Sequence, residues 1–259
     1  MLSCNASLVA QHWYIAKKQE IFVLLISQRK HGCYNTTMNW VTLPGVPLGT
    51  KVFSKLQTPM RLHPFNGLHC SGQRSEWSLA SFSQEVYEVT RGAIVLGQDY
   101  GGLVGANVSL QVPIRALVLT GSALGPWWLP TKYSSIPVLQ KFFYHCFGGS
   151  LFAKRGFLKE NRSTVEQDFQ EELAIPDLPT RMRNTARALE IPKGLAQKLS
   201  VPVFLVWGKK DRWYPPIVAQ AISKAISAPI FWVDGGHYCM WESPQQFDSA
   251  LRQIEERLL

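Results

Sequence analysis

The sequence lacks the features of a membrane-spanning or exported chain. Its longest run of apolar residues, 21–26, is far too short to cross a bilayer. The chain does not open on a charged segment followed by an apolar stretch and a cleavage site, so we expect no signal peptide. These absences favour a cytoplasmic protein that does not act at a membrane.

Closely spaced cysteine pairs are also missing. The five cysteines are odd in number and widely separated, and no two of them form a Cys-x-x-Cys pair. A disulfide framework or a zinc site normally needs paired, regularly spaced cysteines, so we expect reduced thiols and no metal. The cysteines are Cys4, Cys33, Cys70, Cys146 and Cys239.

Acidic residues are fewer than basic ones, and the chain carries a formal net charge of +9. The basic residues are nevertheless scattered, and no run interleaves them with aromatic residues as in a nucleic-acid-binding module. We therefore expect a solvated surface and no nucleic-acid partner. With 46% hydrophobic and 17% charged residues over 259 positions, the chain can bury the core of one large domain.

Short apolar runs alternate with segments of helical periodicity along the chain. Continuous apolar runs of this length are typical of strands buried on both faces of a parallel sheet, so the pattern predicts an α/β fold. The predicted strands are 12–15, 21–26, 65–69, 94–97, 115–120, 201–207 and 229–233. The predicted helices are 51–56, 78–90, 101–111, 216–226 and 244–258.

The central motif is a glycine-rich turn between a predicted strand and a predicted helix. It has the form Gly97-x-Asp99-x-Gly101, followed by Gly102. This is the form of a nucleophile elbow, where small residues are needed because the turn is strained and the helix crowds the strand. The residue at the tip is Asp99, and a carboxylate there can attack carbon and form an ester intermediate.

Two further polar residues follow later strands. Asp211 lies just after the strand predicted at 201–207, and His237 follows the strand predicted at 229–233. Parallel α/β sheets place their sites at the carboxyl ends of the strands, so we expect Asp99, Asp211 and His237 to meet at one edge. An imidazole there can activate water as a general base, and the second carboxylate can fix its tautomer.

Taken together, these residues resemble the α/β-hydrolase-fold enzymes that use an aspartate nucleophile. That branch includes haloalkane dehalogenases, epoxide hydrolases and fluoroacetate dehalogenases. The resemblance rests on the elbow, on the Gly-x-x-Asp turn at 208–211 and on the Gly-Gly-His segment at 235–237 with its trailing Glu-x-Pro. It implies a mostly parallel sheet flanked by helices, with a core of residues 1–123 and 200–259 and a helical cap of residues 124–199 inserted before the acid strand.

The resemblance also implies a two-step reaction without a cofactor. Asp99 attacks an sp³ carbon, and His237, oriented by Asp211, activates the water that hydrolyses the resulting ester. The family's oxyanion loop is matched by His31-Gly32-Cys33, with Trp40 and Pro44 downstream in the loop. The backbone N–H groups of Cys33 and Tyr100 would then stabilise the oxyanion.

The leaving group stays open between halide and epoxide oxygen. Tyr100 stands where haloalkane dehalogenases typically have a halide-binding Trp, and Trp127 or Trp128 could supply a halide donor instead. Tyr144 lies in a segment similar to the one that holds an epoxide-protonating tyrosine. Each of these aromatic residues could equally be part of the cap core or the pocket wall.

The resemblance is weaker over residues 12–77, which leaves a second function open. The alternative is a catalytically silent α/β-hydrolase fold that serves as a binding or scaffold module. For the enzyme, we expect a small apolar substrate as the only partner and a monomer or homodimer as the assembly.

Overall fold

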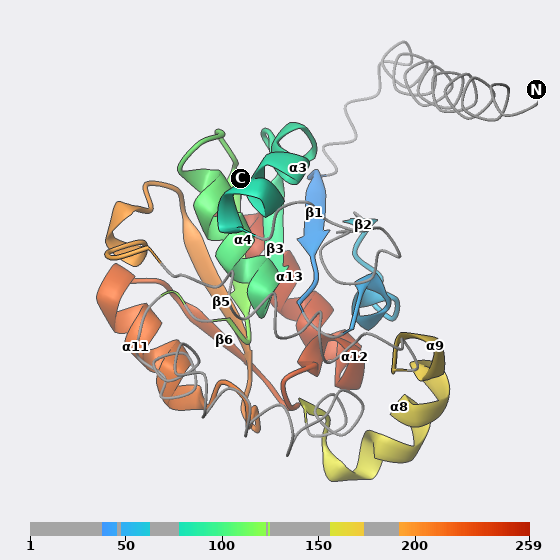
Figure 1. Cartoon of the computed structure of the whole chain (residues 1–259). Coiled ribbons are helices and arrows are strands. Elements are labelled where there is room, and N and C mark those ends of the chain that lie inside the picture. Colours follow the sequence, from blue (N-terminus) through green and yellow to red (C-terminus); the bar gives the residue numbers. More distant parts are fainter. Residues whose placement is uncertain (1–37, 46–47, 63–77, 123, 125–155, 174–191) are drawn as a thin grey trace, which may run out of the picture. The chain divides into compact units, whose positions relative to one another are not determined.

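A computed structural model gives the arrangement of most of the chain (Figure 1). The chain divides into residues 1–37 and residues 38–259, and the described residues all belong to the second unit. The structure describes residues 38–45, 48–62, 78–122, 124, 156–173 and 192–259.

In the described part of the chain, six parallel strands form one sheet in the order β2-β1-β3-β4-β5-β6. Because every neighbouring pair is parallel, the carboxyl ends of the strands all lie at the same edge of the sheet. The strands are β1 (Trp40–Leu43), β2 (Arg61–Leu62), β3 (Ile94–Gln98), β4 (Ala116–Thr120), β5 (Val203–Gly208) and β6 (Ile230–Val233).

Side chains that alternate along each strand build one hydrophobic core on each face of the sheet. In β3, for example, Val95 joins one core, whereas Ile94 and Leu96 join the other. Residues of α3 (Leu79–Thr90), α4 (Tyr100–Ser109) and α11 (Pro216–Ile226) pack into the first core. Residues of η1 (Thr50–Phe53), α8 (Arg162–Asp168), α12 (Cys239–Glu242) and α13 (Pro244–Leu258) pack into the second. Three further short helices lie among the described residues: η2 (Lys159–Asn161), α9 (Gln170–Leu173) and η3 (Ala196–Lys198).

Local sequence signals account for where the long helices begin. The Ser78 hydroxyl accepts a hydrogen bond from the Ser81 N–H, and the Ser81 hydroxyl accepts one from the Ser78 N–H. Together the two bonds form a capping box for α3. Proline stands in the first turn of α11 and α13, where its missing N–H leaves no helical bond unmade. The predicted α/β fold and the helices predicted at 78–90, 101–111, 216–226 and 244–258 are thus confirmed, as is a short helix near 51–56.

At β1, the strand next to β3, the structure differs from the prediction. Trp40 was expected in a loop, yet Trp40–Leu43 forms β1 and pairs in parallel register with Ile94–Gly97. Pro44, also expected in a loop, lies just after the strand. All four residues of β1 are buried, and the Trp40 indole donates a hydrogen bond to Glu255 Oε1 at 2.6 Å. Large and β-branched residues suit such a strand, which at four residues is too short to give a clear periodic signal.

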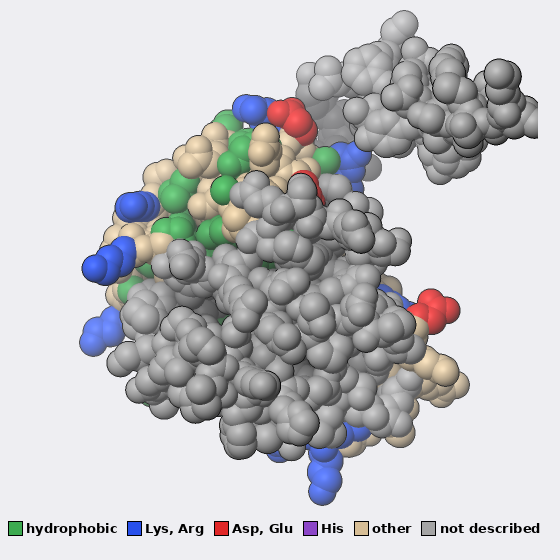
Figure 2. Space-filling view, in the orientation of Figure 1, with side chains coloured by type: hydrophobic (Ala, Val, Ile, Leu, Met, Phe, Trp, Pro, Cys, Tyr) green, Lys and Arg blue, Asp and Glu red, His purple; other side chains and the backbone are tan. Residues whose placement is uncertain are grey.

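Several predictions fall outside the described residues. They are the strands at 12–15, 21–26 and 65–69, and most of the cap at 124–199. Among the described residues, no helix is long and apolar enough to cross a membrane. On the face drawn in Figure 2, the described Lys and Arg side chains stand mostly apart and form no continuous basic patch.

Candidate active site

The turn between β3 and α4 holds Asp99 in a strained backbone conformation. Asp99 has φ 50° and ψ −118°, which is rare for a residue with a side chain. Its N–H donates to Thr120 O at 3.0 Å, and its own carbonyl accepts from the Ser122 hydroxyl at 2.7 Å. These bonds to the end of β4 stabilise the sharp turn, as expected of a nucleophile elbow.

Glycines around Asp99 allow the chain to pack at this density. A Cβ added at Gly101 would lie 1.9 Å from Leu43 O, and one at Gly97 would lie 2.4 Å from the Gly102 Cα. Real Cβ atoms do not approach other atoms so closely, so each position requires glycine. The predicted reason for the small residues, crowding between strand and helix, is confirmed.

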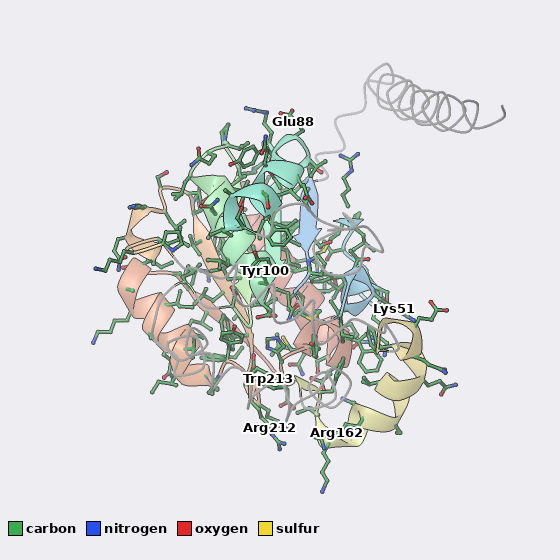
Figure 3. The ribbon with its side chains drawn as sticks, in the orientation of Figure 1. Lys51, Glu88, Tyr100, Arg162, Arg212 and Trp213 are labelled. Atoms are coloured by element: carbon green, nitrogen blue, oxygen red, sulfur yellow. The ribbon has the colours of Figure 1, made fainter. Side chains whose placement is uncertain are left out.

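Asp211 and His237 form a buried pair after β5 and β6. Asp211 Oδ2 lies 3.0 Å from His237 Nδ1, and both side chains are almost fully buried. The other oxygen, Oδ1, accepts the backbone N–H groups of Trp213 and Tyr214 at 2.8 and 2.9 Å. The loop therefore fixes the carboxylate that orients the imidazole. Figure 3 shows Trp213 in this loop, below Tyr100 at the start of α4.

Two opposing effects act on the pKa of His237. Burial lowers the pKa of the imidazole, but the carboxylates of Asp211, Asp99 and Glu242 together raise the pKa above its usual value. The Tyr214 ring stacks on the imidazole, with centroids 5.6 Å apart and planes 25° apart. The influence of Asp99 on the His237 pKa puts the elbow carboxylate and the imidazole in one electrostatic environment.

Gln98, the residue before Asp99, bridges two loops. Its side chain is fully buried, and Oε1 accepts the Gly45 N–H at 2.8 Å. Its Nε2 lies 2.8 Å from His237 Nε2. Gly45 follows β1 and is close to the elbow, since a Cβ added there would lie 2.4 Å from Asp99 Cβ and 2.8 Å from Asp99 Oδ2.

Gly121 follows β4 and lies against the acid–histidine pair. It has φ +52°, and a Cβ added there would lie 2.6 Å from both Cε1 and Nδ1 of His237. The same Cβ would lie 3.2 Å from Asp211 Oδ2. A side chain at this position would therefore displace the imidazole or break its bond to the carboxylate.

Glu242 links the loop that carries His237 to residues 156–161, which belong to the predicted cap. Its carboxylate accepts the N–H groups of Gly236 at 2.6 Å and Leu158 at 2.5 Å, and the Asn161 amide at 3.1 Å. Burial raises the pKa of Glu242, although these hydrogen bonds oppose the shift. In addition, the His237 N–H donates to Gly156 O at 2.8 Å. Residues 156–161 thus form part of the support for His237.

The structure brings Asp99, Asp211 and His237 to one edge of the sheet, together with Tyr100. The Tyr100 ring is buried and packs edge-on against Phe82, with centroids 5.3 Å apart, and the Tyr100 backbone begins α4 directly after Asp99. Among the described residues, no group of three or more His, Cys, Asp and Glu side chains could hold a metal ion. The other predicted site residues, Gly32, Cys33, Trp127, Trp128 and Tyr144, lie outside the described residues.

Four residues at this site were not predicted from the sequence, namely Gln98, Gly45, Gly121 and Glu242. The position of Gln98 beside Asp99 and the Pro-Gly step after residues 40–43 were visible signals. Gly121 also follows a predicted strand, as Asp211 and His237 do. Glu242 was noted within the Glu-x-Pro segment, but nothing in the sequence indicated which N–H groups it would accept.

A known protein family matches most of this sequence. The family model described as "Alpha/beta hydrolase family" matches residues 8–250. No curated protein sequence gives a significant match. The structure is similar to an esterase from Exiguobacterium antarcticum, with TM-score 0.69, 18% identity and coverage of 84% of this chain and 91% of that one.

Two other solved structures are similar to this fold to about the same extent. A hydrolase from Pseudomonas aeruginosa PA01 aligns with TM-score 0.68 and 17% identity over 84% of this chain and 89% of that one. An enol-lactonase from Burkholderia xenovorans LB400 aligns with TM-score 0.65 and 14% identity, over 87% and 94% of the two chains. These identities are low, so the similarities establish the fold, whereas the family match spans most of the sequence. The chain therefore belongs to the α/β hydrolase family.

Proposed function

We propose that the protein is a hydrolase that acts through an alkyl ester on Asp99. Its substrate would be a small apolar epoxide or haloalkane. The observation that carries the proposal is the strained turn at Asp99, at the same sheet edge as the buried Asp211–His237 pair. A carboxylate presented in this way, with an imidazole in its electrostatic environment, suits covalent catalysis followed by hydrolysis.

In the first step, a carboxylate oxygen of Asp99 forms a bond to an sp³ carbon. The bond from that carbon to its leaving group breaks, and the electron pair departs with the leaving group. A halide leaves as the anion, whereas an epoxide oxygen takes a proton. An ionised carboxylate can do this at neutral pH without a base. His237 therefore has no role in forming the ester.

In the second step, water attacks the carbonyl carbon of the ester. Its proton passes to His237 Nε2, while the carbonyl electron pair moves onto oxygen and makes an oxyanion. The oxyanion then collapses, the bond from the Asp99 carboxyl carbon to the ester oxygen breaks, and the departing alcohol oxygen takes the proton from the imidazolium. Asp211 Oδ2 holds the opposite ring nitrogen and stabilises the imidazolium. We propose the Tyr100 N–H as one oxyanion donor and, beside the predicted Cys33, Gly45 as another, since Gly45 lies against Asp99.

The similar solved structures include an esterase and an enol-lactonase. The residue at the elbow of this chain nevertheless favours attack on a different kind of carbon. The nucleophile elbow of this fold ordinarily carries serine, whose oxygen attacks an acyl carbon and gives a new ester. A carboxylate that attacked an acyl carbon would give an anhydride, whereas attack on an alkyl carbon gives a hydrolysable ester. Asp99 therefore favours an alkyl substrate.

Donors for the leaving group would come from the predicted cap, residues 124–199. Trp127 or Trp128 would hold a halide, and Tyr144 would protonate an epoxide oxygen. The cap assignment is supported by residues 156–161, which contact the histidine loop through Glu242 and the His237 N–H. Halide release and diol formation from matched substrates would separate the two chemistries.

A single turnover in ¹⁸O-labelled water tests the proposal. With Asp99 as nucleophile, the first product carries ¹⁶O from the carboxylate, and the peptide that contains Asp99 gains ¹⁸O. Asp99→Asn should abolish turnover, whereas the matched control Asp234→Asn, at an exposed carboxylate, should leave it intact. Label that enters the product directly would refute the ester. No turnover of any epoxide or haloalkane would favour the alternative, a silent fold used for binding.

A further inference from the structure

The side-chain amide of Gln98 links His237 to the backbone N–H of Gly45, which lies close to the elbow. One end accepts the Gly45 N–H and the other contacts His237 Nε2, each at 2.8 Å. An amide has one end that accepts and one that donates. Because the Gly45 N–H can only donate, Oε1 must face Gly45, and the NH₂ group must face the imidazole.

This arrangement fixes the proton on the resting histidine. Since the Gln98 NH₂ group donates to Nε2, that nitrogen accepts through its lone pair, and the ring proton lies on Nδ1. Nδ1 in turn donates to Asp211 Oδ2 at 3.0 Å. This is the neutral tautomer that a general base needs. However, the lone pair that would take a proton from water is already occupied by the amide.

Protonation of His237 is incompatible with this bond. A proton on Nε2 would face the Gln98 NH₂ group, and two donors 2.8 Å apart cannot bond. Rotation of the amide through about 180° lets Oε1 accept from the imidazolium instead. The same rotation turns the NH₂ group toward Gly45, so the Gly45 N–H loses its acceptor.

The other groups around His237 favour the cation once Nε2 takes a proton. Three carboxylates act on the ring by charge, and two tyrosine rings contact it. These groups are Asp211, Asp99, Glu242, Tyr214 and Tyr238.

The released Gly45 N–H lies close to the Asp99 carboxyl group, where the oxyanion would form. Gly45 is so close to Asp99 that an added Cβ would contact both Cβ and Oδ2 of the carboxylate side chain. We propose that Gln98 is a positioning residue whose amide couples protonation at His237 Nε2 to release of the Gly45 N–H beside Asp99. Its use in catalysis rests on the proposed function, because ester hydrolysis protonates the base and creates an oxyanion in the same step.

The coupling itself is a property of the resting protein and can be tested without a substrate. In protein labelled with ¹⁵N, the ring-nitrogen shifts of His237 report its tautomer and titration, and hydrogen exchange reports protection of the Gly45 N–H. We expect an unprotonated Nε2 above the pKa. After correction for intrinsic exchange, protection of Gly45 should fall about tenfold or more as His237 becomes protonated, with the same midpoint.

Two variants separate the coupling from a structural role. Gln98→Met has a similar length but neither hydrogen bond, so Gly45 should be unprotected at every pH, with no step linked to His237. Gln98→Glu keeps an acceptor for Gly45 but loses the donor to His237, so the His237 midpoint should rise by about one pH unit or more. Circular dichroism checks that each variant folds.

The wild-type titration decides the proposal even if a variant fails to fold. Protection of Gly45 that does not change with His237 protonation would overturn it, and so would a neutral His237 with its proton on Nε2. If the coupling is observed but no ester ever forms on Asp99, the proposed function fails and the coupling stands. If the ester forms on Asp99 without the coupling, the coupling fails and the proposed function stands.

Discussion

Asp99 and His237 lie at the same sheet edge, but the chain holds them in different ways. His237 is almost fully buried, both ring nitrogens have partners, and its backbone N–H is bonded to Gly156. Asp99 is only half-buried and is presented by the backbone of a strained turn. The base is thus positioned through its side chain, and the nucleophile through the fold of the main chain. A side chain added to the tightly packed backbone of the elbow should disrupt folding, whereas one added against the His237 ring should slow one chemical step.

The largest expected effect is on folding, at the elbow. Gly101→Ala would place a Cβ 1.9 Å from Leu43 O, which is backbone and cannot move aside. We expect a loss of about 3 kcal/mol or more in the free energy of unfolding, measured by urea denaturation. Gly105→Ala is the control on the same helix, because its Cβ would meet only side-chain atoms at 3.0 Å or beyond. Equal losses in the two variants would contradict this account.

The next effect is on the hydrolysis step. Gly121→Ala would place a Cβ 2.6 Å from two atoms of the His237 ring, so the imidazole must shift. We expect ester hydrolysis to slow by about 100-fold while ester formation is kept, as resolved by rapid-quench mass measurement.

Gly92→Ala separates this contact from backbone strain. Gly92 has φ +68° and nothing within 4 Å of an added Cβ, so this variant shares the strain alone. Similar slowing of hydrolysis in both variants would show that the contact with His237 does not matter.

The pH dependence sharpens the comparison between the two steps. The pKa of His237 is raised, so the neutral base that accepts a proton from water forms only above the usual value of about 6.5. Ester hydrolysis should therefore slow about tenfold for each pH unit below the raised pKa, whereas ester formation does not follow this titration. Single-turnover kinetics at several pH values measure both. A hydrolysis midpoint below 6.5 would contradict the assignment.

The smallest effect is expected at Glu242. Glu242→Gln removes the charge and one acceptor from a site where three N–H groups converge. We expect a loss of about 1–3 kcal/mol in the free energy of unfolding and a lower pKa for His237. Glu256→Gln, at an exposed position, is the control. An unchanged His237 titration in the Glu242 variant would show that this carboxylate supports the loop without acting on the base.

From Ser78 onward, the sequence correctly predicted the sheet strands and the long helices among the described residues, for physical reasons. These strands give continuous apolar runs, and β3 and β4 are buried along their whole length. Asp99, Asp211 and His237 each follow such a run within a few residues. Parallel pairing then places them at one edge whatever the details of packing. Three short loops therefore carried enough information to predict the arrangement of the acid, the base and the turn.

The region around β1 could not be predicted in the same way. Four residues are too few to show a period, and the burial of Trp40–Leu43 comes from neighbours far away in the chain, including Glu255. Gly45 has a role only because β1 pairs with β3. The bridge through Gln98 likewise depends on contacts between loops, which no local pattern encodes.

The most direct test of the central claim is to stop the reaction after its first step. His237→Gln removes the base that hydrolysis needs but leaves Asp99 in place. After incubation with a short haloalkane or an aryl epoxide, the intact mass should increase by the substrate-derived group, and peptide mapping should locate it on Asp99. An unchanged mass with every substrate, or an adduct at another residue, would contradict the account.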